Sequence, residues 1–126
     1  MVSFSTEPID PHHVYDMLGK DAAGSALIHF AVAKAAKNRG RVTTHITYEP
    51  DGEVERELRL IEAEIAEKWN ITDVLLLRRQ GMVAAGEIIS VIAVSSPGSE
   101  AAFAACQFGL ERMKKMSTII KTEILE

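Results

Sequence analysis

Two-residue alternation and short apolar runs indicate several β-strands along the chain. Residues 42–49 alternate branched and polar side chains, so that Ile46 and Tyr48 share one side of a predicted strand. The other segments with strand character are 2–6, 25–33, 73–81, 87–96 and 118–125. Residues 82–87 suit the turn of a hairpin between two of these strands. The polar and basic residues 33–41 predict a mobile loop.

Spacings of three and four residues between apolar side chains indicate two amphipathic helices. The first follows a Pro-Asp-Gly break, and its apolar stripe consists of Val54, Leu58, Ile61, Ile65 and Trp69. The second opens at Ser96-Pro97 and ends near Lys114. Its stripe, which we expect to be buried, consists of Phe103, Cys106, Leu110 and Met113. Strands and helices together predict a single α+β domain over residues 1–126.

Composition narrows the classes of function. Apolar residues make up 47% of the 126 residues and charged residues 25%, the ordinary balance of a globular protein. The net charge of -4 argues against a surface that tracks nucleic acid or an anionic membrane, so any anion site must be local. Cys106 is the single cysteine, which fits a reducing compartment, and no apolar run approaches the length of a membrane span. We expect a cytoplasmic protein.

Three lysines near the end of the chain raise the question of a local anion site. Lys114 and Lys115 lie at the predicted end of the second helix, where a cation commonly does no more than interact with the helix dipole. Lys121 is different because it interrupts the apolar run IIKTEIL and lies on a half-polar face or in a cleft. If Lys121 is buried, its pKa falls, which suits a nucleophile or a proton carrier.

Other residues that could bind a ligand or take part in catalysis are more simply explained as surface or core residues. Arg78 and Arg79 end a predicted strand and could bind phosphate or carboxylate, although surface arginines are more common. The four histidines lack helical metal-ligand spacing, and Cys106 lies on an apolar stripe. We therefore expect neither a metal nor a bound cofactor, and the residues alone leave the activity open.

Four sequence pieces occur in a telling order: GSALIHF, VTTHITYE, EIAEKWNITDVLLLRRQGMVAAGEIISVIAVSS, and EAAFAACQFGLERMKK followed by IIKTE. Together they span Gly24 to Glu123, about four fifths of the chain, and resemble the large, catalytic subunit of molybdopterin synthase. The resemblance implies an α/β hammerhead-type fold with an antiparallel sheet and two main helices, and a homodimer.

The resemblance also implies an activity and its residues. The family accepts the Gly-Gly tail of a small ubiquitin-like sulfur carrier, which ends as a thiocarboxylate, and transfers two sulfurs to cyclic pyranopterin monophosphate. The catalytic lysines of the family match Lys114 and Lys121, which leaves Lys115 a bystander. Arg79, with Lys34 or Arg39, is the implied binding site for the substrate phosphate.

Several positions depart from the family pattern. Gly98 and Ser99 stand where the family has a His-Arg pair, and Arg78 stands where it has a histidine. Thr118 and Ile120 replace a proline and a tryptophan, and the family commonly extends beyond the residue matching Glu126. Each lost charge donor typically costs on the order of 10²–10³ in rate. Three hypotheses stay open: a divergent synthase, a catalytically impaired homologue that binds a carrier-like partner or another small anion, and an unrelated α+β dimer.

Overall fold

A computed structural model of the chain describes residues 1–35, 37–38 and 40–125. The helices are α1 (Pro11–Met17), α2 (Val54–Lys68) and α3 (Ser99–Lys114). The strands are β1 (Val2–Ser5), β2 (Ser25–Val32), β3 (Lys37–Asn38), β4 (Arg41–Pro50), β5 (Asp73–Arg79), β6 (Gly81–Ala84), β7 (Ile88–Ser96) and β8 (Ile119–Leu125). The predicted α+β class is confirmed.

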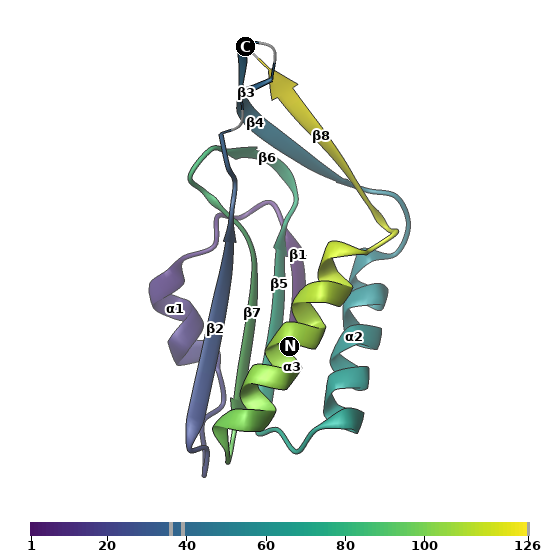
Figure 1. The fold of residues 1–126 in the computed structure, drawn as a ribbon. Coiled ribbons are helices and arrows are strands. Elements are labelled where there is room, and N and C mark those ends of the chain that lie inside the picture. Colours follow the sequence, from purple (N-terminus) through teal and green to yellow (C-terminus); the bar gives the residue numbers. More distant parts are fainter. Residues whose placement is uncertain (36, 39, 126) are drawn as a thin grey trace.

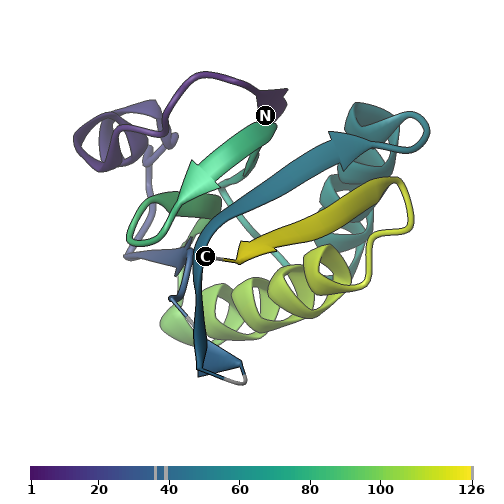
Figure 2. The same cartoon turned by 90° about the horizontal axis from the view of Figure 1, so that it is seen from above.

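The strands form two sheets that meet at one end of the molecule. The first sheet has the order β1-β5-β7-β2 and lies between α1 on one face and the pair α2 and α3 on the other (Figure 1). β1 runs parallel to β5, and the other pairs are antiparallel. The second sheet is built on β4, which pairs antiparallel with β3, β6 and β8. Figure 2 shows β4 and β8 side by side above α3.

Two hydrophobic clusters hold the first sheet between its helices. The larger cluster joins α2 and α3 to the sheet and includes Leu58, Ile61, Ile65, Leu76, Ile92 and Cys106. The smaller cluster lies under α1 and includes Val14, Leu18, Leu75, Leu77, Val91 and Ala93. Because Leu75 and Leu76 belong to different clusters, β5 is buried on both faces, which explains its continuous apolar run. The predicted apolar stripe of α2 is confirmed, with Trp69 partly buried at its end.

The prediction for the second helix is wrong in two respects. α3 begins at Ser99 rather than Ser96, because Ser96 continues β7 and pairs with Ser25. Phe103 was expected in the core but is 63% exposed. Cys106 and Met113 of the predicted stripe are buried as expected, and small residues such as Ala105 and Gly109 share their face of α3. A Cβ at Gly109 would collide with the side chain of Ile92. The helix therefore approaches the sheet too closely for a large aromatic side chain.

Two predicted loops contain strands. Part of the segment predicted as the 82–87 turn belongs to β6, which pairs with β4 through residues such as Val83 and Ile46. The basic segment 33–41 contains β3 and begins with buried Ala33, whose N–H donates to the carbonyl of Glu87 at 2.9 Å. Pairing with β4 supplies hydrogen-bond partners for these short segments, which their composition does not reveal. None of the helices in the described part of the chain is long and apolar enough to cross a membrane.

Candidate functional site

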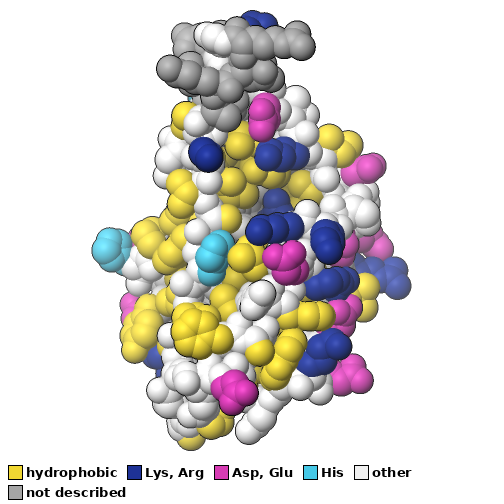
Figure 3. Space-filling view, viewed as in Figure 1, with side chains coloured by type: hydrophobic (Ala, Val, Ile, Leu, Met, Phe, Trp, Pro, Cys, Tyr) yellow, Lys and Arg dark blue, Asp and Glu magenta, His cyan; other side chains and the backbone are white. Residues whose placement is uncertain are grey.

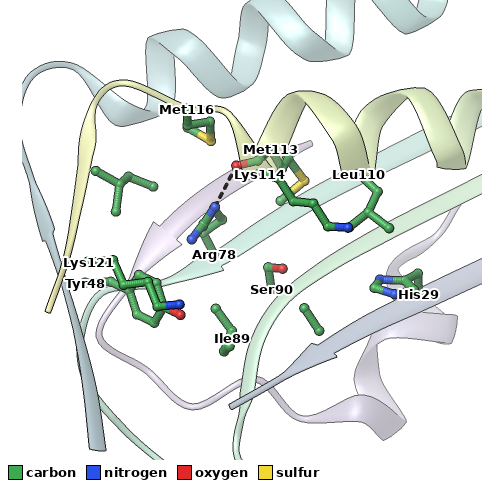
Figure 4. A pocket seen from close by; sticks show the side chains of 12 residues that line it. His29, Tyr48, Arg78, Ile89, Ser90, Leu110, Met113, Lys114, Met116 and Lys121 are labelled. Atoms are coloured by element: carbon green, nitrogen blue, oxygen red, sulfur yellow. Dashed lines mark hydrogen bonds between the residues drawn. The ribbon is translucent and has the colours of Figure 1, made fainter. Parts of the chain in front are cut away.

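A pocket of about 380 Å³ opens where the end of α3 meets the two sheets (Figure 4). Its lining residues are His29, Ala31, Tyr48, Arg78, Ile89, Ser90, Leu110, Met113, Lys114, Met116, Ile119 and Lys121. The space-filling view shows basic side chains gathered around an apolar hollow on this face of the molecule (Figure 3). The pocket thus combines cationic groups with an apolar wall, as small-molecule sites commonly do.

The structure brings Lys114 and Lys121 to the same pocket. Lys114 is the last residue of α3, and Lys121 lies on β8 opposite Tyr48 of β4. Their side chains are 62% and 54% exposed, so neither lysine is buried. Each forms a loose ion pair with a residue on its own element, Lys114 with Glu111 at 4.0 Å and Lys121 with Glu123 at 3.8 Å. Both ammonium groups are therefore accessible to an anion in the pocket.

Arg78 contributes a guanidinium to the same pocket from β5. Its Nη1 donates to the carbonyl oxygen of Met113 at 3.0 Å, and its guanidinium carbon lies 5.4 Å from the centre of the Tyr48 ring. Burial lowers the pKa of Arg78, while the charges of Tyr48 and Glu57 act in the opposite direction. Burial also raises the pKa of Tyr48, against the effect of the Arg78 charge. At neutral pH the pair consists of a cationic guanidinium and a neutral phenol.

His29 and Ser90 complete the polar lining on the side of β2 and β7. Nδ1 of His29 is buried and has no hydrogen-bond partner among the described residues. Ser90 is buried and lies opposite Arg78 in the β5–β7 ladder. Tyr48 and Ser90 were not predicted as site residues, and the spacing of the histidines, His29 among them, predicts only the absence of a metal site. The signal that could have found Ser90 is the register of β5 against β7, because it places Ser90 beside Arg78.

Comparison with known protein families assigns the chain to one of them. The family model described as "MoaE protein" matches residues 4–116, most of the chain. The chain belongs to the MoaE family. The molybdopterin synthase catalytic subunit of Staphylococcus epidermidis is 34% identical over 122 residues, which cover 96% of this chain and 81% of that protein. The corresponding protein of Bacillus subtilis is 33% identical over 120 residues, covering 94% of this chain and 76% of the relative.

Solved structures agree with the family assignment. The crystal structure of molybdopterin synthase from Staphylococcus aureus matches with a TM-score of 0.89 and 29% identity, covering 98% of this chain and 90% of that chain. A complex of subunits 1 and 2 of molybdopterin-converting factor from Helicobacter pylori, at 9% identity, shares the fold with a TM-score of 0.71 over 99% of this chain and 85% of that chain. The predicted resemblance to molybdopterin synthase catalytic subunits and the predicted fold class are both confirmed.

Arg79 and Lys34, two of the residues predicted to bind the substrate phosphate of this MoaE-family protein, do not line the pocket. Arg79 is 6% exposed and points away from the pocket, where its Nη2 donates to the carbonyl oxygen of Met82 at 3.3 Å and its Nη1 lies 3.6 Å from Glu87. Lys34 is exposed between β2 and β3 and does not line the pocket. Arg39 lies outside the described residues. Arg78, the neighbour of Arg79, is the arginine that the structure brings to the lysines.

The positions of the missing His-Arg pair of the MoaE pattern lie far from this pocket. Gly98 and Ser99 lie at the start of α3, whereas Lys114 lies at its end. Fifteen helical steps separate Ser99 from Lys114, which is about 22 Å at 1.5 Å per residue. A side chain at position 98 or 99 cannot reach its own chain's pocket. Among the described residues, no group of three or more His, Cys, Asp or Glu could hold a metal ion.

Proposed function

We propose that this MoaE-family protein is the catalytic subunit of a molybdopterin synthase. In this reaction sulfur passes from the thiocarboxylate of a small carrier protein to cyclic pyranopterin monophosphate. The observation that carries the proposal is the meeting of Lys114 and Lys121 in one pocket, seven residues apart in sequence but on different elements. The relatives named above, which bear this activity in their names, support it.

The pocket has the chemical groups that this transfer requires. Both reactants are anions, and two accessible ammonium groups can hold them close together and compensate their mutual repulsion. A lysine beside the reacting centre can also donate a proton to a leaving group as the ammonium, and the amine that this leaves can take a proton from an incoming water. Leu110, Met113 and Ile119 supply the apolar wall, which suits the flat face of a pterin ring and excludes water.

The partners follow from the proposed substrate. A Gly-Gly tail has no side chains, so it can enter a pocket of about 380 Å³ beside the pterin. The Helicobacter pylori structure, described as a complex of two subunits of molybdopterin-converting factor, supports a small carrier subunit as the partner. We also propose a homodimer in the cytoplasm, the compartment that fits the single cysteine.

The direct test is reconstitution with purified components. The protein is mixed with a thiocarboxylated carrier and cyclic pyranopterin monophosphate, and molybdopterin is assayed. A carrier that ends in an ordinary carboxylate is the matched control, because it has the same tail without transferable sulfur. Molybdopterin formed only with the thiocarboxylated carrier would support the proposal. Carrier binding without any product would instead favour the catalytically impaired homologue.

A further inference from the structure

Arg78 is a half-buried cation without a carboxylate partner. One of its N–H groups donates to the carbonyl oxygen of Met113 at 3.0 Å, but its buried Nε has no hydrogen-bond partner among the described residues. No ion pair to Arg78 occurs within the part of the chain that the structure describes. The neighbouring Arg79 also has a buried Nε without a hydrogen-bond partner among the described residues, but it differs in its ion pair, because Glu87 lies 3.6 Å from its guanidinium.

The carboxylate whose charge acts on Arg78 already has hydrogen-bond partners of its own. The charge of Glu57 acts on Arg78, but its two carboxylate oxygens accept hydrogen bonds from Thr118 and Ser117 instead. A guanidinium has five N–H donors in a planar fork, and burying them unpaired is costly. Sites that bind anions retain such groups, because the missing acceptor arrives with the ligand.

We propose that Arg78 is a binding residue of the pocket, and that its free N–H groups take a carboxylate or phosphate group of the bound molecule between Lys114 and Lys121. Figure 4 shows Arg78 next to the end of α3 and close to Tyr48, with the two lysines on either side of the pocket. The bond to Met113 fixes the plane of the guanidinium, so the remaining donors are oriented before the ligand arrives.

The identity of the bound molecule rests on the proposed function, which offers two sources of the same chemistry. One is the terminal carboxylate or thiocarboxylate of the carrier tail, and the other is the phosphate of the pterin. Both accept two parallel hydrogen bonds from an arginine. The experiment must therefore separate the two sources.

The first measurement follows the Nε–H signal of Arg78 by NMR in the unchanged protein. R78K serves to assign the signal, and the two probes are inorganic phosphate and a carrier that ends in an ordinary Gly-Gly carboxylate. We expect one probe to shift this signal saturably, while the Nε–H signal of exposed Arg56 stays in place. A signal of Arg78 that responds to neither probe overturns the proposal.

The second measurement compares the affinity of R78Q with that of the matched surface variant R56Q. Loss of a hydrogen bond to a charged group predicts a dissociation constant raised roughly 10- to 100-fold for the same probe that shifts the NMR signal. A carrier-specific loss assigns Arg78 to the tail, and a phosphate-specific loss assigns it to the pterin phosphate. Folded R78Q that binds both probes like R56Q contradicts the proposal.

Neither readout requires turnover, so the two proposals can fail separately. A protein that binds a probe through Arg78 but forms no molybdopterin contradicts the proposed function alone. A protein that forms molybdopterin with R78Q as efficiently as with R56Q contradicts the role of Arg78 alone.

Discussion

The carboxylate of Glu57 accepts two hydrogen bonds from Thr118, one from the backbone N at 3.2 Å and one from Oγ1 at 2.7 Å. Thr118 in turn offers its carbonyl oxygen to the N–H of Asp51 at 2.6 Å. These bonds tie the first turn of α2 to the turn that leads into β8, three residues before Lys121. The family pattern has a proline at position 118, which would lack the N–H donor. Hydrogen bonds to Glu57 thus hold the turn before β8 in this protein, where a proline ring could restrict the backbone in relatives with the family pattern.

Glu57→Ala should loosen this connection. It leaves the Thr118 N–H and hydroxyl without an acceptor, and we expect a loss of about 1–2 kcal/mol in the free energy of unfolding, measured by chemical denaturation. Sulfur transfer should fall as well, because Lys121 follows the turn. Glu55→Ala is the matched control, since Glu55 lies in the same helical turn but has only an exposed pair with Arg59. Equal stability of the two variants would contradict the anchoring role of Glu57.

Lys114→Ala and Lys121→Ala should separate catalysis from stability. Removing either ammonium takes a preorganised charge from the pocket, so we expect the rate of molybdopterin formation to fall on the order of 10²–10³. Both side chains are exposed with loose ion pairs, so the melting temperature should stay nearly unchanged. Lys115→Ala is the control, because Lys115 does not line the pocket. A lysine variant that loses stability without losing rate would indicate a structural lysine.

The pattern of the sequence predicts most of the fold where side chains are large. The stripe of α2 is buried as predicted, because its branched side chains lie on one face of the helix and that face packs against the first sheet and α3. In the predicted stripe of α3, Cys106 and Met113 are buried as expected. The prediction failed at Phe103, because hydrophobicity ranks this residue above Ala105 and Gly109. The fit between helix and sheet favours the small residues, and it depends on Ile92, which is distant in sequence.

The sequence predicts only part of the site. Lys121 stands out because it breaks an apolar run, and the resemblance adds Lys114. Arg78 and Arg79 cannot be told apart in this way, because adjacent residues of a strand point to opposite faces and the sequence does not tell which face holds the pocket. In the structure Arg78 lines the pocket, whereas Arg79 forms an ion pair with Glu87.

Arg79→Ala should affect stability rather than substrate binding. The change removes a buried guanidinium that bonds the Met82 carbonyl and pairs with Glu87. We expect a loss of about 2 kcal/mol in the free energy of unfolding, moderated because Glu87 is partly solvated. Arg59→Ala, at an exposed position on α2, should stay within about 0.5 kcal/mol of the parent protein. A raised KM for the pterin at unchanged stability would instead assign Arg79 to the substrate.

Cys106 should be unreactive in the folded protein. Its side chain lies in the core between α3 and the sheet, and burial raises the pKa of its thiol. Because the thiolate is the nucleophile, an aromatic disulfide reagent at pH 8 should label the native protein far more slowly than the denatured protein. Rapid labelling of the native protein would mean that this part of the core opens readily.

The raised pKa of Cys106 also predicts the sign of a pH effect on stability. Below the ordinary thiol pKa of about 8.5, both the folded and the unfolded chain hold the proton, and the contribution is fully present. Above it, the unfolded chain releases the proton before the folded chain does, so stability falls as pH rises, by at most about 1.4 kcal/mol per pH unit. Cys106→Ala has no thiol to titrate, so its unfolding free energy should decline less between pH 8 and pH 10. Parallel declines in the two proteins would show that the thiol ionises as readily in the folded chain as in the unfolded one.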